Sequence, residues 1–404
     1  MKKDENVFTS GTSRRSFLKK GTVAAGVATM GVGLLRGNTF ALEGNDNDDD
    51  GAPITKGDIA ILKFLQALEQ VEDDLWRQYT ELGGLADPIS ESFGFTTGNG
   101  PYTNSLLKLD GDMPQYIHDN TDDEISHQRF LGNYLASKGV NSADLSPFRL
   151  IDGSTAAGAL IVNGKPAKRL TNLTHLTIDT SFWTRYRSIT NPDFDPKATF
   201  DQAVKGLNVG FHTAIPRTNT DTTGDPNLID AIAFTAGFHF AFIEVGGSSL
   251  YPTLAQKVTN LEVLRILLSI GPSETMHFQT WQDKAGNANQ GNPDLTVTDP
   301  INGFPVTFTD LHVATGESAN ETDNQGKVLQ ANLIMPEPTH FLDPKFGPVA
   351  IIRPTSTRLN GAVAAVTGLV NDGLFFNPNT GGNTPIVGLL LDLAEEADAA
   401  RRRL

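Results

Sequence analysis

Two short segments, Glu124-Ile-Ser-His127 and Glu274-Thr-Met-His277, decide what fold and chemistry this sequence predicts. In each segment a histidine follows a glutamate by three residues. Residues i and i+3 of an α-helix lie on one face about a turn apart, so each pair can hold a metal ion between a carboxylate and an imidazole. A third segment with this spacing, Glu337-Pro-Thr-His340, follows Pro336 and contains Pro338, so we do not expect it to be helical.

Both pairs lie in sequence with the apolar periodicity of long helices. The first pair belongs to a helix predicted from 112 to 138, which opens with Asp112-Met-Pro114 and is stopped by Gly139. The second pair belongs to a helix predicted from about 253 to 286, with a kink at Pro272. Two further helices are predicted at 58–83 and 225–252.

Each of these two further helices carries a glutamate inside its apolar stripe. The residue is Glu244 in the helix 225–252, and in the helix 58–83 it is Glu72, with Glu69 as the alternative. Tyr79 follows Glu72 by seven residues and Tyr251 follows Glu244 by seven, which is two helical turns. This repeat favours Glu72, because no residue in the other helix reproduces the spacing of Glu69.

Four carboxylates and two imidazoles on four helices are the ligand set of dinuclear carboxylate bundles. The predicted metal ligands are Glu72, Glu124, His127, Glu244, Glu274 and His277. Oxygen and nitrogen donors without thiolates suit Fe or Mn, and a buried glutamate without a cation would be costly. We therefore expect two Fe or two Mn ions, with two bridging carboxylates and one histidine on each ion.

With these motifs, residues 58–286 resemble the ferritin-like superfamily, and more closely its exported branch related to plant desiccation-associated proteins. The resemblance is carried by four segments, Leu68–Trp76, Asp123–Leu131, Glu244–Tyr251 and Gly271–His277. It implies an all-α, four-helix bundle whose metal ligands are the six residues above. A storage ferritin subunit is one bare bundle, so the additional segments of this chain argue against an iron-storage cage.

The segments outside the four helices define the remaining domain organisation. Residues 140–224 are expected to be a long crossover between the second and third helices, with a hairpin at 160–164 and one helix near 170–189. Such a crossover makes those two helices parallel. Residues 287–404 are expected to be a mostly irregular or β extension, with apolar runs at 306–308 and 349–352, that ends in an amphipathic helix at about 385–402.

The N-terminus resembles a twin-arginine export signal. Ser13-Arg14-Arg15-Ser16-Phe17-Leu18-Lys19 precedes an apolar run at 21–35 and the small-residue site Thr39-Phe40-Ala41. The run is shorter than the roughly 20 residues of a membrane-spanning helix. We therefore expect residues 1–41 to be cleaved, residues 42–57 to be an acidic linker, and the mature protein to be periplasmic or extracellular without a membrane span.

Replacing Arg14 and Arg15 by lysine is expected to block this export. The variant should accumulate in the cytoplasm as a precursor that keeps residues 1–41, because the arginine pair is the feature read by the twin-arginine route. Immunoblotting of cell fractions measures the precursor. Unchanged export would mean that the signal is a general secretory one.

Composition narrows the function further. The 404 residues contain no cysteine, which excludes disulfides, thiolate metal sites and a cysteine nucleophile, and the net charge of −15 argues against nucleic acid as a partner. Two functions remain. One is a redox enzyme of the oxidase, peroxidase or catalase type that reacts with O2 or peroxide, in which Tyr79 or Tyr251 orients a ligand or passes an electron. The other is a non-catalytic stress-protective or structural protein. Metal content distinguishes them, and a homodimer is compatible with either.

Overall fold

The computed structural model describes residues 53–85, 98–186, 201–311 and 361–403. The predicted export signal, residues 42–52 of the predicted acidic linker, the segment Glu337–His340 and the apolar run 349–352 lie outside these residues. The described chain is mostly helical with little sheet, so the expected all-α core is confirmed.

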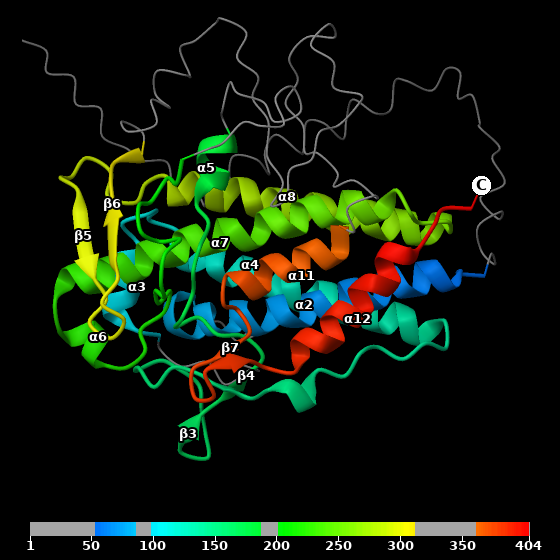
Figure 1. The fold of residues 1–404 in the computed structure, drawn as a ribbon, viewed down its shortest axis with the longest axis horizontal. Helices are drawn as coiled ribbons and strands as arrows, with labels where there is room; N and C mark the ends of the chain where they lie inside the picture. The colour runs from blue at the N-terminus through cyan, green and yellow to red at the C-terminus, as the bar shows by residue number, and fades with distance from the viewer. Residues whose placement is uncertain (1–52, 86–97, 187–200, 312–360, 404) are drawn as a thin grey trace, which may run out of the picture. The chain divides into compact units, whose positions relative to one another are not determined.

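Four long helices lie side by side and form the core: α2 (Lys56–Gly83), α4 (Met113–Ser137), α7 (Pro226–Ala255) and α8 (Leu261–Ala285) (Figure 1). The starts of α2 and α7 are capped by side-chain hydrogen bonds, whereas Asp112, the predicted cap of α4, makes no such bond. Thr55 and Asp58 form a capping box at α2, and the Asp225 side chain accepts a hydrogen bond from the Asn227 backbone N–H at α7.

The boundary between the last two helices differs from the prediction. We expected the third helix to end at 252 and the fourth to begin at about 253, but α7 continues through Pro252 to Ala255. The helix α8 begins at Leu261, where the Asn260 side chain accepts from the Val263 backbone N–H at 3.1 Å. Apolar residues continue at helical spacing through this turn, so the periodicity did not indicate Asn260 as a cap.

Contacts between side chains fix the helix directions. Glu69 of α2 lies near Glu274 of α8. Seven residues later in each helix, the rings of Trp76 and Trp281 stack with their centroids 5.4 Å apart. The helices α2 and α8 are therefore parallel. Trp281 also donates a hydrogen bond to Asn120, four residues before Glu124, so α4 runs the opposite way.

The direction of α7 follows in the same way. Trp76 and Tyr79 of α2 contact Phe240, which precedes Glu244, so α7 is antiparallel to α2 and parallel to α4. The second and third long helices are thus parallel, as the placement of the two Glu-x-x-His pairs required.

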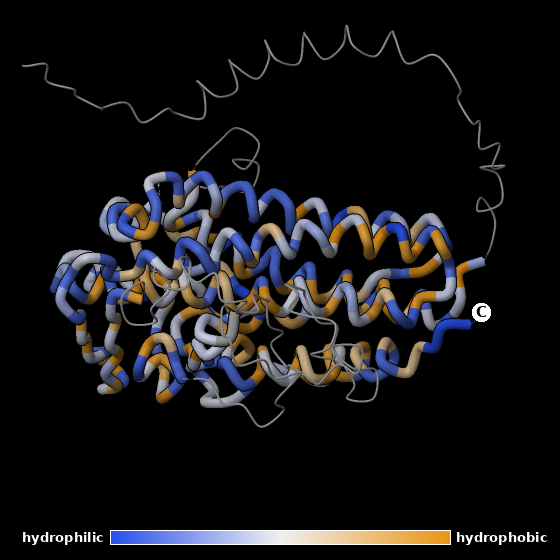
Figure 2. The backbone as a smooth tube through the Cα atoms, turned by 90° about the horizontal axis from the view of Figure 1, so that it is seen from above, coloured by the Kyte–Doolittle hydropathy of each residue, from blue (hydrophilic) through white to orange (hydrophobic). Residues whose placement is uncertain are grey.

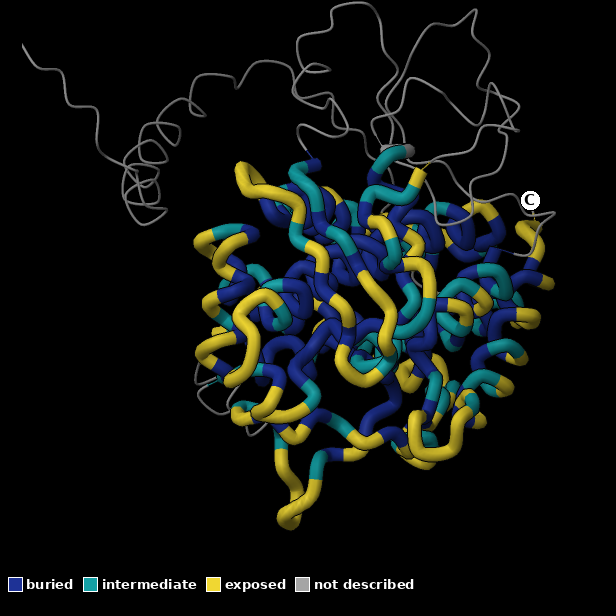
Figure 3. The backbone as a smooth tube through the Cα atoms, turned by 60° about the vertical axis from the view of Figure 1, so that its left-hand side comes forward, coloured by how far each residue is buried: buried dark blue, intermediate teal, exposed yellow. Residues whose placement is uncertain are grey.

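The crossover between α4 and α7 is built from short elements. They are η3 (Ser146–Phe148), β1 (Ile151–Asp152), β2 (Ile161–Val162), β3 (Lys165–Pro166), β4 (Lys168–Arg169), α5 (Ser181–Tyr186) and α6 (Thr220–Thr223). The strands β2 and β3 form the expected hairpin, whose turn residues Asn163 and Gly164 have φ of 53° and 74°. This exposed hairpin projects from the lower edge in Figure 3.

The helix expected near 170–189 is shorter than predicted. Only α5 forms, at Ser181–Tyr186, and residues 187–200 lie outside the described chain. The backbone N–H groups of Leu170 and Thr171 bind the buried Asp74 carboxylate of α2, and that of Asn172 binds the Leu374 carbonyl. These tertiary hydrogen bonds replace the ones a helix would make.

A buried ion pair attaches the crossover to α2. The Arg169 guanidinium donates to both carboxylate oxygens of Glu81 at 2.5 and 2.7 Å, and neither side chain is more than 4% exposed. Arg169→Met should lower the free energy of unfolding by about 3–5 kcal/mol, because it leaves a buried carboxylate without its cation. Lys168→Met is the matched control: its pair with Asp152 is solvent-exposed, so we expect about 0–1 kcal/mol. Urea denaturation measures both, and equal losses would contradict the prediction.

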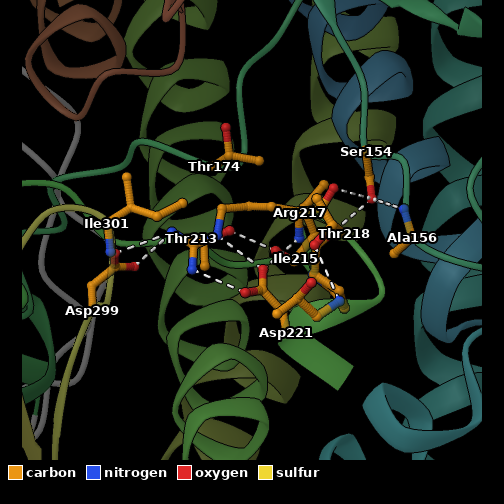
Figure 4. A network of polar contacts seen from close by, with 12 residues as sticks. Ser154, Ala156, Thr174, Thr213, Ile215, Arg217, Thr218, Asp221, Asp299 and Ile301 are labelled. Carbon is orange, nitrogen blue, oxygen red and sulfur yellow. Dashed lines mark hydrogen bonds and ion pairs between the residues drawn. The ribbon is translucent and has the colours of Figure 1, made fainter. Parts of the chain in front are cut away.

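A second polar network holds the end of the crossover. Arg217 pairs with Asp221 at 2.9 Å and with Asp299 at 3.0 Å, and the backbone carbonyl of Arg217 accepts from the Thr155 N–H (Figure 4). Asp299 directly follows β5 (Leu295–Thr298), which pairs antiparallel with β6 (Pro305–Phe308). The network therefore connects the crossover to the first hairpin of the C-terminal extension.

The C-terminal extension is more helical than predicted. Besides the expected terminal helix α12 (Ile386–Ala399), it contains α11 (Gly361–Asn371) and the hairpin β7 (Phe376–Asn377) and β8 (Gly382–Asn383). The helix α12 packs on α2, and α11 packs on α12 and α7. The Asp398 carboxylate of α12 accepts from the backbone N–H groups of Ala362 and Val363. The cap of α11 is thus a distant residue, which local sequence does not reveal.

The helix α7 alone, within the described residues, is long and apolar enough to cross a membrane. We expected no such stretch beyond the export signal. However, 89% of its most apolar window is buried inside the fold, which is the environment of a core helix. In Figure 2 hydrophilic and hydrophobic stretches alternate along the helices, and in Figure 3 the buried segments lie inside an exposed outer layer.

Candidate metal centre

Glutamate and histidine side chains from all four long helices converge in the core. Two groups of four have ligand atoms within 4.8 Å of one another: Glu69, Glu124, His127 and Glu274 in one, and Glu124, Glu244, Glu274 and His277 in the other. We call their union the Glu/His cluster. Glu124, Glu244 and Glu274 have no solvent exposure, and His127 and His277 are less than 10% exposed.

Glu124 and Glu274 belong to both groups, whereas each histidine belongs to one. His127 Nδ1 lies 3.1 Å from Glu124 Oε2 and 3.2 Å from Glu274 Oε1. His277 Nδ1 lies 3.2 Å from Glu124 Oε1 and 3.9 Å from Glu274 Oε2. The two oxygens of each shared carboxylate therefore face different histidines.

The remaining position in each group is taken by one further glutamate. Glu69 Oε2 lies 3.4 Å from His127 Nδ1, and Glu244 Oε2 lies 3.4 Å from His277 Nδ1. The cluster has an approximate twofold pattern as a result, in which α2 and α4 mirror α7 and α8.

The structure places Glu69, not Glu72, against His127. Five of the six predicted ligands lie in the cluster, and the sixth position is filled by the alternative residue one turn earlier in α2. Glu72 is only partly buried and lines a small pocket beside Glu69, Gly247 and Tyr251. Burial raises the pKa of Glu72, and repulsion by the charges of all four cluster glutamates raises it further.

Each histidine is also held from its outer side by the residue that precedes a cluster glutamate. His277 Nε2 lies 3.0 Å from Asp123 Oδ2, and His127 Nε2 lies 3.2 Å from Ser273 Oγ. These contacts orient the rings so that Nδ1 faces the cluster, as partners of metal-binding histidines do. The sequence reasoning missed both residues, although their position next to Glu124 and Glu274 is a signal that could have found them.

Two further polar side chains position the carboxylates. Asn120 Nδ2 donates to Glu124 Oε1 at 2.8 Å and to Glu244 Oε1 at 3.1 Å. Tyr251 Oη donates to Glu69 Oε1. Asn120 was not predicted, yet it precedes Glu124 by four residues and so shares its face.

Of the two predicted tyrosines, only Tyr251 contacts the cluster. Tyr251 reaches the cluster, but through Glu69 of α2 and not through Glu244 of its own helix. Tyr79 lies ten residues beyond Glu69, about 15 Å further along α2 at 1.5 Å per residue. Its Oη is 2.7 Å from His239 Nδ1.

A glycine in α7 makes room for one shared carboxylate. A Cβ atom on Gly247 would lie 2.7 Å from Glu274 Oε2, closer than real contacts allow. Close packing at the cluster therefore accounts for a residue that weakens the helix by roughly 1 kcal/mol relative to alanine.

The crowding of carboxylates shifts their pKa values in different directions. Burial raises the pKa of Glu124 to about 7, against the opposing effect of the two histidines. Burial and repulsion by Glu124 hold the pKa of Glu274 well above its usual range. For Glu69, burial raises the pKa, but the attraction to His127 outweighs it, so its pKa is lowered. Burial lowers the pKa of each histidine, but the surrounding glutamates reverse this and raise it.

Several buried atoms of the cluster make no hydrogen bond. They are Glu69 Oε2, Glu244 Oε2, both oxygens of Glu274, and His277 Nδ1. Buried polar atoms are nearly always satisfied, and these five point toward one another instead. They are electron-pair donors, so a cation held by each four-residue group would satisfy them. The residues present therefore fit a metal site.

The space beside the cluster is small and mostly apolar. A cavity with room for about 20 Å³ is lined by leucines of α2 and α7, by Ala365 and Leu369 of α11, and by Glu69 and Glu72. This is enough for a molecule of the size of water or dioxygen, but not for an organic substrate.

The chain matches no protein-family model, and neither a curated protein nor a solved structure shows significant similarity to it.

Proposed function

We propose that the Glu/His cluster binds two Fe or Mn ions and that the protein is a dinuclear redox protein with a ferritin-like bundle. The observation that carries the proposal is the pair of four-residue groups that share Glu124 and Glu274. Two separate ions explain why two carboxylates are shared and why each histidine faces one group.

The charge of the four carboxylates also supports two bound ions. When all four are ionised, the carboxylates of Glu69, Glu124, Glu244 and Glu274 carry four negative charges in a buried site. Two divalent cations balance these charges with both histidines neutral, and they keep the carboxylates deprotonated. A single dication would leave the site with uncompensated buried charge, which is costly.

Bound at the cluster, a pair of Fe or Mn ions supplies electrons to small oxidants. The protein contributes the rest: Glu124 and Glu274 hold the two positions together, and Asn120 and Tyr251 fix the outer carboxylates. The small cavity at Glu69 and Glu72 has room for a reactant of the size of dioxygen or hydrogen peroxide.

Metal analysis of protein purified after native expression tests the proposal. We expect about two Fe or Mn ions per chain, as for other carboxylate-bridged bundles. Dioxygen uptake or peroxide loss by the loaded protein, compared with metal-free protein, then measures the reaction. Protein without Fe or Mn, or with weakly held Ca2+ only, would contradict it.

The same small cavity favours a second candidate function. A cluster this enclosed could hold its metal as a structural element of a stress-protective protein, as the resemblance to desiccation-associated proteins suggests. In that case the metal analysis finds no Fe or Mn or only weakly held Ca2+, or, if two ions are bound, dioxygen and peroxide are consumed no faster than by free metal.

A further inference from the structure

A second buried polar group lies in the core beyond the cluster, at the paired side chains of Tyr79 and His239. Tyr79 Oη and His239 Nδ1 are 2.7 Å apart, and neither residue has any solvent exposure. Burial holds the pKa of Tyr79 well above its usual range, so the phenol is protonated and donates this hydrogen bond. Nδ1 is then the unprotonated nitrogen of His239 and can accept a proton.

The other side of His239 faces a buried carboxylate. Asp372, at the end of α11, has Oδ2 3.5 Å from His239 Nε2, while its Oδ1 accepts from the Leu374 backbone N–H at 2.8 Å. A positive charge on His239 would therefore arise beside a carboxylate that the fold holds in place. Burial raises the pKa of Asp372, and nearness to His239 opposes that shift.

Aromatic rings in contact with one another join this pair to the Glu/His cluster. The Tyr79 ring centroid is 5.7 Å from that of Trp76, and Trp76 stacks on Trp281 at 5.4 Å with an interplanar angle of 22°. Trp281 Nε1 donates to Asn120 Oδ1 at 2.7 Å, and Asn120 binds Glu124 and Glu244. All these side chains are buried, so the connection excludes water along its length.

Another buried tyrosine shows that a phenol hydroxyl in this core does not need a histidine as its hydrogen-bond acceptor. Tyr102 is also fully buried, and its Oη donates to the Ala214 backbone carbonyl at 2.8 Å. A carbonyl satisfies the hydroxyl equally well but cannot take its proton at neutral pH. Tyr79 instead has an acceptor that can.

We infer that Tyr79 is a redox-active residue that gives one electron through Trp76 and Trp281 toward the Glu/His cluster while its proton moves to His239 Nδ1. The electron reduces a tryptophan radical cation back to neutral tryptophan. The O–H bond of Tyr79 breaks, an N–H bond forms on His239, and a neutral tyrosyl radical and an imidazolium remain. The one-electron oxidant that first takes an electron from Trp281 is dioxygen or hydrogen peroxide reacting at the cluster, and only this origin of the oxidant rests on the proposed function.

Flash photoionisation of tryptophan in the metal-free full-length chain tests the pathway without any metal. The tryptophan radical absorption should decay as the sharper absorption of a tyrosyl radical grows, because Trp76 is in contact with Tyr79. Tyr79→Phe should abolish this tyrosyl signal. Tyr102→Phe is the matched control and should retain it.

The role of His239 is tested by the rate of the same step. His239→Gln keeps a polar partner for the phenol but cannot accept the proton, so we expect transfer about 100-fold slower, the scale of a lost general base. The wild-type rate should fall in D2O, since electron and proton move together, and that effect would not arise from packing. A radical that survives in Tyr79→Phe, or a rate unchanged in His239→Gln, would overturn the inference.

Electron paramagnetic resonance of Fe- or Mn-loaded protein after peroxide addition separates the two proposals. A tyrosyl radical that disappears in Tyr79→Phe supports the complete pathway. If the photochemical transfer occurs but the protein binds no Fe or Mn, the proposed function fails and the relay stands. If metal binds and peroxide is consumed but the photochemical transfer is absent, the relay fails and the proposed function stands.

Discussion

Replacing Glu124 or Glu274 by alanine is expected to abolish metal binding at both positions of the cluster. Each of these carboxylates faces both histidines, so its loss removes a ligand from two sites at once. Glu69 and Glu244 each face one histidine. Their alanine variants should therefore keep one ion of the pair, with bound metal falling from about two ions per chain to about one.

Elemental analysis after gel filtration measures this difference. Glu262→Ala is the control, because Glu262 lies on α8 like Glu274 but is 46% exposed and pairs with Lys138 at the surface. It should retain full metal content. Variants at Glu69 and Glu124 that lose the same amount of metal would show that the cluster is not divided into two sites. Full retention in Glu72→Ala is also expected, because Glu72 belongs to neither four-residue group.

The choice between Glu69 and Glu72 shows where sequence reasoning reached its limit. The two residues are three apart, so both fall on the apolar stripe of α2, and the rotation of the helix about its axis decides which one faces His127. That rotation depends on tertiary packing, such as Trp76 against Trp281 and Phe240. The spacing of seven residues between glutamate and tyrosine favoured Glu72, but Tyr251 binds a glutamate across the core and Tyr79 binds a histidine.

The Glu-x-x-His pairs were predictable because their geometry is local. The positions of Glu124 and His127 relative to each other follow from the helix alone, as do those of Glu274 and His277. Local caps predicted the starts of α4 and α7, but Thr55 at α2 and Asn260 at α8 were missed although they too are neighbours of their helices in sequence. The helix α11 was missed because its cap is Asp398, and the helix expected after 170 was too long because its backbone binds Asp74.

Metal-free protein is expected to become less stable as pH rises from about 4.5 to 7. In this window an unfolded chain has already ionised Glu124, whereas burial keeps the folded-state pKa at about 7. A pKa that folding raises contributes stability at low pH, and this stability is lost as pH rises through the folded value. The shift from 4.5 to about 7 corresponds to a loss of about 3 kcal/mol from this residue. Glu72 and Glu274 also have raised pKa values and act in the same direction, and the raised pKa values of His127 and His277 do so only above pH 6.5. The lowered pKa of Glu69 opposes these effects near pH 4.5.

Denaturant unfolding of chelator-treated protein at several pH values tests this expectation. Glu124→Gln replaces the carboxyl by a neutral group of the same shape, so its unfolding free energy should fall with pH by about 3 kcal/mol less than that of the wild type. Glu262→Gln, on the exposed face of α8, should leave the slope between pH 4.5 and 7 unchanged. Metal-loaded protein should show the opposite trend, because protons compete with the ions for the same carboxylates and metal binding strengthens as pH rises. Metal-free protein that gains stability over this range would mean that the buried glutamates are ionised and neutralised without a metal, and the charge argument for two ions would fail.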